Sequence, residues 1–292
     1  MHIETLKVFC DVVETRSFST AASQNFVTQS AVSQQVRTLE ERYGRRLLER
    51  TRGNVQTTPA GEVLYHMAKE IVRLYDAMEA KLHEAAEMVA GTVRVAAVPS
   101  VGLYELSAPL RAFLTQYPQV HLRLEYARAS RIYEDAQKGN IDLGIVAYPQ
   151  RRPGISVIPF RQDRLVIVTP PGHPLARTRS ASLARLQGEP LVGFERDIPT
   201  RKETDRLLRR HQVEPRYVTE LDNIETIKRI VEIGHGLALL PEPAVVPEVK
   251  SKSLGMVQIA DEAALRPLGI IHRQGRIFSS AAQKFLECLQ AE

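Results

Sequence analysis

The chain has 292 residues, of which 43% are hydrophobic and 25% are charged, and its formal net charge is +5. This length is about twice that of a typical domain, so two or three folded units are expected. The balance of residues excludes disorder over most of the chain. The positive charge is compatible with nucleic-acid binding but does not require it.

The two cysteines, Cys10 and Cys288, lie near opposite ends of the chain and form no Cys-x-x-Cys pair. Neither a structural zinc site nor a disulfide framework is therefore expected, and both thiols fit apolar helical patterns as buried side chains. The first residues lack the basic start and apolar run of a signal peptide, and charges interrupt every apolar stretch before about 18 residues. We therefore expect a cytoplasmic protein without a membrane span.

Residues 3–50 have the hydrophobic periodicity of three helices. Ser17 precedes the short second helix, Thr28 can cap the N-terminus of the third, and Gly44 can end it. A turn at Gly53-Asn54 between two short segments predicts a small β-wing. The apolar residues expected to face inward are Ile3, Leu6, Phe9, Val12, Val13, Phe18, Ala21, Ala22, Ala31, Val32, Val36 and Leu39.

A long helix is predicted from Pro59 to Ala90, because no further proline interrupts it and its apolar residues alternate four and three apart. Such spacing over more than about 25 residues favours a two-stranded coiled coil, so we expect this helix to form a dimer. The alternative is a helix that packs against its own domain. The expected seam consists of Leu64, Ala68, Ile71, Tyr75, Met78, Leu82, Ala85 and Val89.

Gly91 breaks the helical pattern, and strands then alternate with helices to the C-terminus. This alternation predicts mostly parallel sheets, and about 200 residues with this many strands fit two lobes better than one. The expected strands are Thr92–Val98, Val120–Tyr126, Ile141–Ala147, Ile155–Phe160, Leu165–Thr169, Leu191–Phe194, Arg216–Glu220, Leu237–Leu240 and Leu268–His272. The expected helices lie at about 103–116, 129–138, 201–211, 223–233 and 277–290.

The segment from Thr28 to Glu40 combines an apolar inner face with short polar side chains on the outside. In a helix-turn-helix the second helix lies in the major groove, where Gln can pair with adenine and Arg can bind guanine or phosphate. A polar helix face is more often simply solvated, but a helix, short helix, turn, polar helix and basic wing in this order favour DNA binding. The candidate DNA-binding residues are Gln29, Ser30, Ser33, Gln34 and Arg37 on the helix, and Arg50 and Arg52 on the wing.

Residues 3–61 closely resemble the N-terminal domain of LysR-type transcriptional regulators. The matching motifs are Leu6-x-x-Phe9, Ser17-Phe18-Ser19-x-Ala21-Ala22, Thr28-Gln29-Ser30-Ala31-Val32-Ser33, Leu39-Glu40, Leu47-Leu48-Glu49-Arg50-Thr51-Arg52 and Thr57-Thr58-Pro59-Ala60-Gly61. The resemblance extends through the long helix and the strand pattern that follows it. Many members carry Arg at the position of Gln34 and Pro at the position of Ser30. These departures leave the preferred DNA sequence open, but they do not put DNA binding in doubt.

The resemblance implies that residues 92–292 form two α/β lobes like those of periplasmic substrate-binding proteins, with a small molecule in the cleft between them. Two helix starts support this independently, because a hydroxyl, backbone N–H groups and the helix dipole can meet an anion there. Ser100 and Val101 lie at the first start, and Thr200 and Arg201 at the second, where Arg201 can grip a carboxylate. The alternatives are that the hydroxyls are ordinary N-caps and that the guanidinium is solvated. Weaker candidates at strand ends are Tyr126, Arg128, Ala147 and Asp222.

Residues 91–292 carry 28 Lys and Arg against 22 Asp and Glu, which favours a small anion or carboxylate as the effector. No motif of a hydrolase, a nucleotide-binding enzyme or a metalloprotease occurs, so we expect no enzyme, no metal site and no cofactor. Two other classes remain open. A solute-binding protein fits the C-terminal part but not the helix-turn-helix, and a DNA-binding protein without an effector fits both.

We therefore expect a multi-domain protein with an N-terminal all-α winged helix-turn-helix domain at residues 1–58, a linker and dimerisation helix at 59–90, and a two-lobed α/β effector-binding domain at 91–292. Lobe I would comprise about 91–160 and 268–292, and lobe II about 161–267. Such a dimer would bind an interrupted inverted repeat in double-stranded DNA. The resemblance further implies pairing to a homotetramer and, for an activator, contact with RNA polymerase.

Overall fold

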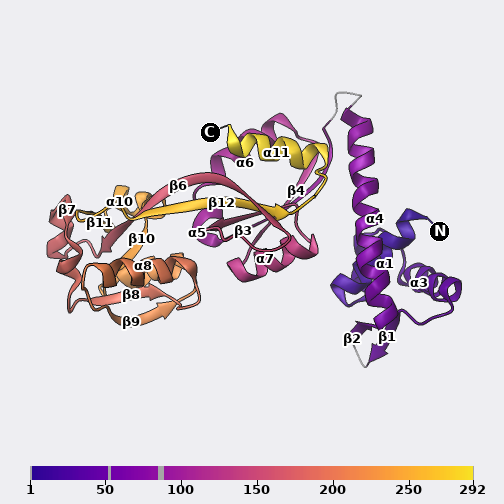
Figure 1. Cartoon of the computed structure of the whole chain (residues 1–292), viewed down its shortest axis with the longest axis horizontal. Coiled ribbons are helices and arrows are strands. Elements are labelled where there is room, and N and C mark those ends of the chain that lie inside the picture. The colour runs from indigo at the N-terminus through magenta and orange to yellow at the C-terminus, as the bar shows by residue number, and fades with distance from the viewer. Residues whose placement is uncertain (1, 52–53, 85–88, 292) are drawn as a thin grey trace. The chain divides into compact units, whose positions relative to one another are not determined.

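The computed structural model describes residues 2–51, 54–84 and 89–291. Its contacts divide the chain into two compact units, Met1–Met88 and Val89–Glu292. Figure 1 shows that the first unit is built mainly of helices and the second of strands and helices together. The long helix therefore belongs to the same unit as the N-terminal helices.

The N-terminal unit packs four helices and a β-hairpin around one core. Its elements are α1 (Ile3–Thr15), α2 (Phe18–Gln24), α3 (Gln29–Tyr43), β1 (Leu48–Thr51), β2 (Asn54–Thr57) and α4 (Pro59–Glu84). The Ser17 side chain accepts the N–H of Thr20 where α2 begins, and the Thr28 side chain accepts the N–H of Ala31 where α3 begins, each at 3.2 Å. Helix α3 ends at Gly44, so the predicted start and end of the third helix are both confirmed.

The core of this unit is formed by the apolar faces that the periodicity predicted. Every residue expected to face inward on the first three helices is buried or half-buried, and Phe9 and Val32 are fully enclosed. The β1–β2 hairpin closes one end of the core, with Leu48 opposite Thr57. A Cβ atom at Gly61 would lie 1.9 Å from the carbonyl oxygen of Leu47, so only glycine lets the first turn of α4 approach the hairpin.

Helix α4 divides its apolar residues between its own domain and the surface. Ala68 is fully buried, and Leu64 packs against the core of the same unit. The prediction that these two residues form a dimer seam is therefore wrong. They pack against their own domain, which was the alternative considered for this helix. Tyr75 is half-buried. The residues of α4 that do lie exposed are Val63, Met67, Ile71, Leu74 and Met78.

Three further positions of the expected seam need separate mention. Val89 begins the C-terminal unit and packs half-buried against the core of lobe I, so its assignment to the seam is also wrong. The side chain of Leu82 and the whole of Ala85 lie outside the described part of the chain, as do residues 86–88 of the predicted helix. Val89 and Ala90 are described and are not helical, so the prediction that the helix reaches Ala90 is wrong at these two residues.

The C-terminal unit has two lobes that share two long strands. The chain passes from lobe I to lobe II along β6 (Ile155–Thr169) and returns along β12 (Leu265–Arg273). Both strands run from one lobe to the other in Figure 1, and they pair antiparallel from Leu265 opposite Arg164 to Arg273 opposite Ile155. The two segments predicted as separate strands, Ile155–Phe160 and Leu165–Thr169, are thus one strand, because the polar residues between them form the lobe crossing.

Lobe I contains a sheet covered by helices on both faces. Its elements are β3 (Gly91–Ala97), α5 (Pro99–Gly102), α6 (Ser107–Gln116), β4 (Val120–Tyr126), α7 (Ala129–Lys138), β5 (Leu143–Ala147) and α11 (Ser280–Gln290). Phe113 of α6 and Phe285 of α11 are fully buried on one face, where their rings meet edge to face at 4.9 Å. Ile132 of α7 is buried in a second cluster. The helix predicted at 103–116 is confirmed only as α6, which begins four residues later, and the short helix α5 before it was not predicted.

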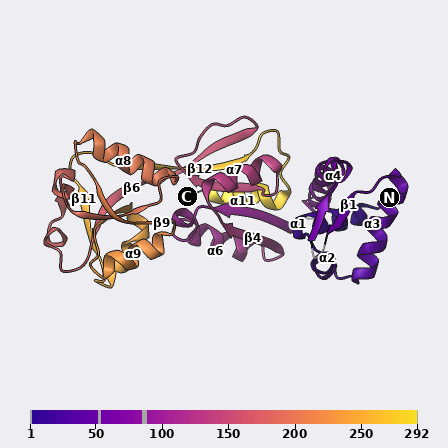
Figure 2. The ribbon, with the colours of Figure 1, turned by 90° about the horizontal axis from the view of Figure 1, so that it is seen from below.

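Lobe II is built from short strands and helices around the far ends of β6 and β12. Its elements are η1 (Pro174–Arg177), β7 (Ser180–Ala181), η2 (Leu183–Leu186), β8 (Pro190–Phe194), α8 (Pro199–Arg210), β9 (Arg216–Leu221), α9 (Ile224–Glu232), β10 (Ala238–Pro241), η3 (Glu242–Ala244), α10 (Val246–Lys250) and β11 (Gly255–Ile259). Strands β7 and β11 and helix α10 were not predicted from the sequence. Figure 2 shows α8 and α9 in lobe II and α6, α7 and α11 in lobe I.

The sheets are mixed, so the expectation of mostly parallel sheets is wrong. The main sheet has the order β4-β3-β5-β12-β6-β11-β7, with β10 also paired to β6, and β8 and β9 form a separate pair. Strands β3, β4 and β5 are parallel, as are β8 with β9 and β7 with β11. All pairs of β6 and β12 are antiparallel, because these strands carry the chain between the lobes in opposite directions.

Candidate functional site

The N-terminal half of α3 presents a row of polar side chains on the surface of its unit. Gln29, Ser30, Gln34 and Arg37 are exposed and Ser33 is half-buried. The opposite face of the helix is anchored by three buried residues, Val32, Val36 and Leu39. The helix is therefore held rigidly, with its first turns available to a partner.

Several of these side chains have weak local contacts. The Ser19 hydroxyl donates to the Gln29 side-chain oxygen at 3.4 Å, and the hydroxyls of Thr28 and Ser30 are 2.9 Å apart. Arg37 pairs with Glu41 at 2.9 Å, and both side chains are well exposed. An exposed pair of this kind contributes little to stability, so Arg37 can exchange its carboxylate for a phosphate at small cost.

The wing is attached to α3 by the carboxylate of Glu40. The sequence indicated this residue only as part of the Leu39-Glu40 motif, without a role. Glu40 accepts hydrogen bonds from the N–H groups of Leu47 and Leu48, at 2.8 and 3.2 Å. It therefore sets the position of β1 against α3. Arg50 lies in β1 opposite Val55, but its side chain is outside the described residues, and so is the whole of Arg52.

Arg266 is a fully buried cation at the junction of the two lobes. Its Nε lies 2.8 and 3.1 Å from the two carboxylate oxygens of Asp163, and its Nη2 lies 2.5 Å from the same carboxylate. It also donates to the hydroxyl of Ser100 at 3.0 Å and to its carbonyl oxygen at 3.3 Å. The predicted effector residue Ser100 is thus tied to the two crossing strands, a link that local sequence patterns cannot reveal.

Arg128 connects the lobes through three carboxylates. It precedes α7 in lobe I and contacts Glu195 at 2.6 Å, Asp197 at 3.1 Å and Asp222 at 3.3 Å, all in lobe II. The hydrogen bond to Glu195 is the main reason that the pKa of Arg128 is raised. The weaker candidates Arg128 and Asp222 are therefore brought together, and the two acidic side chains of the loop after β8 join them.

Arg201 pairs with carboxylates inside lobe II, which corrects the prediction that its guanidinium is free to grip an anion. Its side chain is only 4% exposed and lies inside lobe II, 3.0 Å from both oxygens of Asp205 and 3.3 Å from Glu220. Its Nη1 donates to the carbonyl oxygen of Phe194 at 2.6 Å. Because these protein groups already bind the guanidinium, a ligand anion would have to displace one of them.

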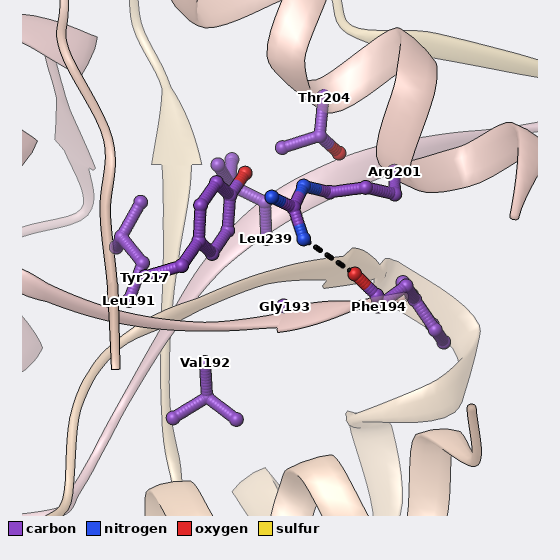
Figure 3. A pocket seen from close by; sticks show the side chains of 8 residues that line it. All are labelled: Leu191, Val192, Gly193, Phe194, Arg201, Thr204, Tyr217 and Leu239. Atoms are coloured by element: carbon purple, nitrogen blue, oxygen red, sulfur yellow. Dashed lines mark hydrogen bonds between the residues drawn. The ribbon is translucent and has the colours of Figure 1, made fainter. Parts of the chain in front are cut away.

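Figure 3 shows the Arg201 guanidinium against the ring of Tyr217, with 3.4 Å between Cζ and the ring centroid. A Cβ atom at Gly193 would lie 2.5 Å from this ring, so glycine makes room for the stack. Burial and the hydrogen bond to Asp205 raise the pKa of Tyr217. The small pocket beside the stack is lined by lobe II alone, through Leu191, Val192, Gly193, Phe194, Arg201, Thr204, Tyr217 and Leu239.

The remaining candidates divide into core and surface residues. Val101 and Ala147 are buried in the core of lobe I, so their side chains are not available to a ligand and these two assignments are wrong. Thr200 is also buried, at the start of α8. Tyr126 is 44% exposed and lies over Gly102 of α5. Exposed functional groups next to Ser100 are therefore fewer than the sequence predicted.

Within residues 2–51, 54–84 and 89–291, no group of His, Cys, Asp and Glu is arranged to hold a metal ion. No helix in these same ranges is both long and apolar enough to cross a membrane.

Two family models together match nearly the whole chain. The model of the bacterial regulatory helix-turn-helix protein, lysR family, matches residues 3–62. The model of the LysR substrate binding domain matches residues 86–292. The first match covers α1 to the start of α4, and the second covers both lobes.

Individual relatives agree with these models over the full length. The HTH-type transcriptional regulator CysL of Bacillus subtilis is 28% identical over 93% of this chain and 91% of its own. The structure of a full-length OxyR variant from Pseudomonas aeruginosa has a TM-score of 0.78 at 20% identity, covering 100% of this chain and 94% of the other. Full-length CbnR in complex with its target DNA has a TM-score of 0.69 at 23% identity, covering 100% and 99%. The chain therefore belongs to the LysR family of helix-turn-helix transcriptional regulators, a family of DNA-binding proteins with an effector-binding domain rather than of enzymes.

Proposed function

We propose that this protein is a homodimeric regulator that reads an interrupted inverted repeat with α3 and the wing, and that a small molecule bound between its C-terminal lobes controls it. The observation that carries the proposal is the exposed row of Gln29, Ser30 and Gln34 on a helix whose other face is buried. Amide and hydroxyl side chains in the first turns of such a helix can pair with base edges. CbnR, which shares the fold, has been solved with its target DNA.

Dimerisation is supported by the exposed face of α4. Val63, Met67, Ile71, Leu74 and Met78 follow one another at intervals of four, four, three and four residues and are between 46% and 67% exposed. From Met67 to Met78 the intervals alternate four and three, as in a coiled-coil seam, and Val63 continues the same exposed face. Ile71 and Met78 belong to this face and also to the seam that the sequence predicted. Two copies related by a two-fold axis would place two α3 helices on two half-sites, which explains the inverted repeat. The resemblance implies a homotetramer and, for an activator, contact with RNA polymerase, and both remain part of the proposal.

Effector binding between the lobes is supported by the way the lobes are joined. Strands β6 and β12 are their covalent links, and Arg128 contacts Glu195, Asp197 and Asp222 across the junction. A ligand near Ser100 and Tyr126 would change the free energy of this arrangement. The preference for an anion or a carboxylate now stands on the basic surplus of residues 91–292 without Arg201, whose guanidinium is paired inside lobe II.

The DNA-binding part is tested by a mobility shift with the DNA immediately upstream of the protein's own gene and a random duplex as competitor. Gln29→Ala or Gln34→Ala is expected to cost about 1–3 kcal/mol on the specific site and little on random DNA. Gln116→Ala, an exposed glutamine in lobe I, serves as the control and changes neither. An equal loss on both duplexes would show that the α3 residues do not read bases.

The effector part is tested by melting the full-length protein with a panel of metabolites. A ligand that binds only the folded state raises the melting temperature. At a free concentration of a hundred times its Kd, it adds about 2.7 kcal/mol to the free energy of unfolding. Tyr126→Ala is expected to reduce the shift and Leu114→Ala, an exposed residue of α6, to leave it unchanged. Ligands that raise the melting temperature without altering the DNA shift would contradict control by the effector.

A further inference from the structure

The turn between α2 and α3 holds a phenylalanine in a backbone conformation that usually requires glycine. The N–H of Phe26 donates to the carbonyl oxygen of Ser23 at 3.4 Å, and the N–H of Val27 donates to that of Ala22 at 3.1 Å. This pair of bonds is the Schellman ending of a helix, in which the residue at the position of Phe26 is left-handed and is most often glycine. Phe26 has a φ of +56°. A side chain at this position crowds the backbone and costs stability.

Burial of the Phe26 side chain does not offset this strain. The Phe26 side chain is 95% exposed, whereas Phe9 and Phe18 of the same unit are buried in its core. The turn itself is held by its neighbour, because the Asn25 side-chain amide donates to Asp11 at 2.7 Å and to the carbonyl oxygen of Ala21 at 2.9 Å. Phe26 is therefore not needed to form the turn. Positive φ also occurs at other non-glycine residues such as Gln212, but Phe26 combines it with an almost fully exposed aromatic ring, a combination that suggests a role in contacting a partner.

The position of the residue indicates which partner. Phe26 comes two residues before Thr28, which caps α3, and three residues before Gln29, the first exposed polar residue of that helix. A DNA duplex bound at the start of this helix offers an exposed aromatic ring two kinds of apolar group, the thymine methyl groups and the deoxyribose carbons. We propose that Phe26 is a DNA-contacting residue whose ring packs on such an apolar group beside the α3 binding site, an inference that rests on the DNA binding by α3 proposed above.

The test separates DNA contact from folding, since Phe26→Gly removes the ring and relieves the strain. For the full-length variant we expect an unchanged or higher melting temperature. We also expect about tenfold weaker binding to a fluorescently labelled duplex from the region upstream of its own gene. If the ring packs on deoxyribose, binding to a random duplex should weaken in the same way. The slope of log Kd against log salt should not change, because no phosphate ion pair is lost.

The chain offers a matched control in Gln212, which also has a φ of +56°. The N–H of Gln212 donates to Arg209 and that of Val213 to Leu208, so the same helix ending recurs in lobe II. Gln212→Gly should relieve the same strain and leave DNA binding unchanged. Phe26→Tyr keeps the ring and should bind as the wild type does.

Replacing thymine by uracil in the duplex distinguishes the two apolar groups. If Phe26 contacts a thymine methyl group, the replacement weakens the wild type and has no effect on Phe26→Gly. If it contacts deoxyribose, both proteins keep their affinity for the uracil duplex and the difference between them remains. Wild-type affinity of Phe26→Gly for both duplexes, or a parallel loss of melting temperature and binding, would overturn the proposal.

Discussion

The recognition helix and the junction of the lobes use polar side chains in opposite ways. On α3, Gln29 and Gln34 are exposed and directed away from the protein. At the junction, Arg266 and Arg128 each contact carboxylates of the protein itself. A side chain that reads DNA must be available to its partner, whereas a buried charge without a counter-ion costs several kcal/mol. Polarity alone therefore does not identify a binding residue, because the same residue types also hold the fold together.

The largest effect is expected at the fully buried Arg266. Arg266→Ala leaves the buried carboxylate of Asp163 without its partner, which should cost about 3–5 kcal/mol of unfolding free energy. The measurement is urea unfolding of the full-length protein, followed for the transition of the C-terminal unit. Arg164→Ala, which removes an exposed pair with Glu242, should cost less than about 1 kcal/mol. Equal losses in the two variants would show that the junction does not depend on the buried pair.

The next effect concerns the exposed face of α4. Ile71→Glu places a charge in the proposed seam and removes apolar area worth about 1.5–3 kcal/mol for each helix, so the dimer should dissociate at least about tenfold more readily. Sedimentation of the full-length protein measures this. Ile277→Glu makes the same change at a side chain of the C-terminal unit that is 58% exposed and should leave the dimer intact. A dimer unaffected by Ile71→Glu would refute the seam.

A third test concerns the thiol of Cys10, which the core of the N-terminal unit keeps neutral. Burial raises the pKa of Cys10 from 9.0 to about 12. Because the folded pKa is the higher one, the stability contribution is complete below pH 9 and is lost as the pH rises towards 12. The loss at pH 10 is about 1.4 kcal/mol. Urea unfolding at about pH 7.5 and pH 10 should show a loss that is larger by this amount in the wild type and in Cys288→Ala than in Cys10→Ala, because other groups with raised pKa values, such as Tyr217, contribute equally to all three. An equal loss in all three proteins would assign the whole effect to those other groups.

The smallest effect on stability is expected where the charges are exposed. Arg128→Gln removes three contacts between the lobes, but solvent screens them, so the free energy of unfolding should change little. Hydrogen exchange of the loop 195–197 should nevertheless become faster. Arg131→Gln removes an arginine of the same helix whose partners Glu125 and Asp135 lie within lobe I, and it should leave this loop unchanged. Equal exchange in both variants would mean that Arg128 does not restrain the lobes.

The two arginines at 201 and 266 illustrate what sequence patterns reveal and what they miss. Arg201 was predicted to bind a ligand because it stands at a helix start, yet Asp205 follows four residues later, a spacing at which opposite charges pair on a helix. That local signal could have indicated an internal partner. Arg266 has no such signal, since Asp163 is 103 residues away in the chain. Only the pairing of β6 with β12 brings the two side chains together.

Local periodicity in the sequence was sufficient to predict the three N-terminal helices with their caps, the outward face of α3, the long helix and most strands of the two lobes. Whether an apolar residue of α4 packs in its own domain or stays exposed for a partner depends on tertiary packing. The apolar residues of α4 form two overlapping stripes that share Ile71 and Met78, and the packing of Leu64 and Ala68 on the N-terminal core leaves only the other stripe exposed. Periodicity records that a face is apolar, but what covers that face depends on residues distant in the chain.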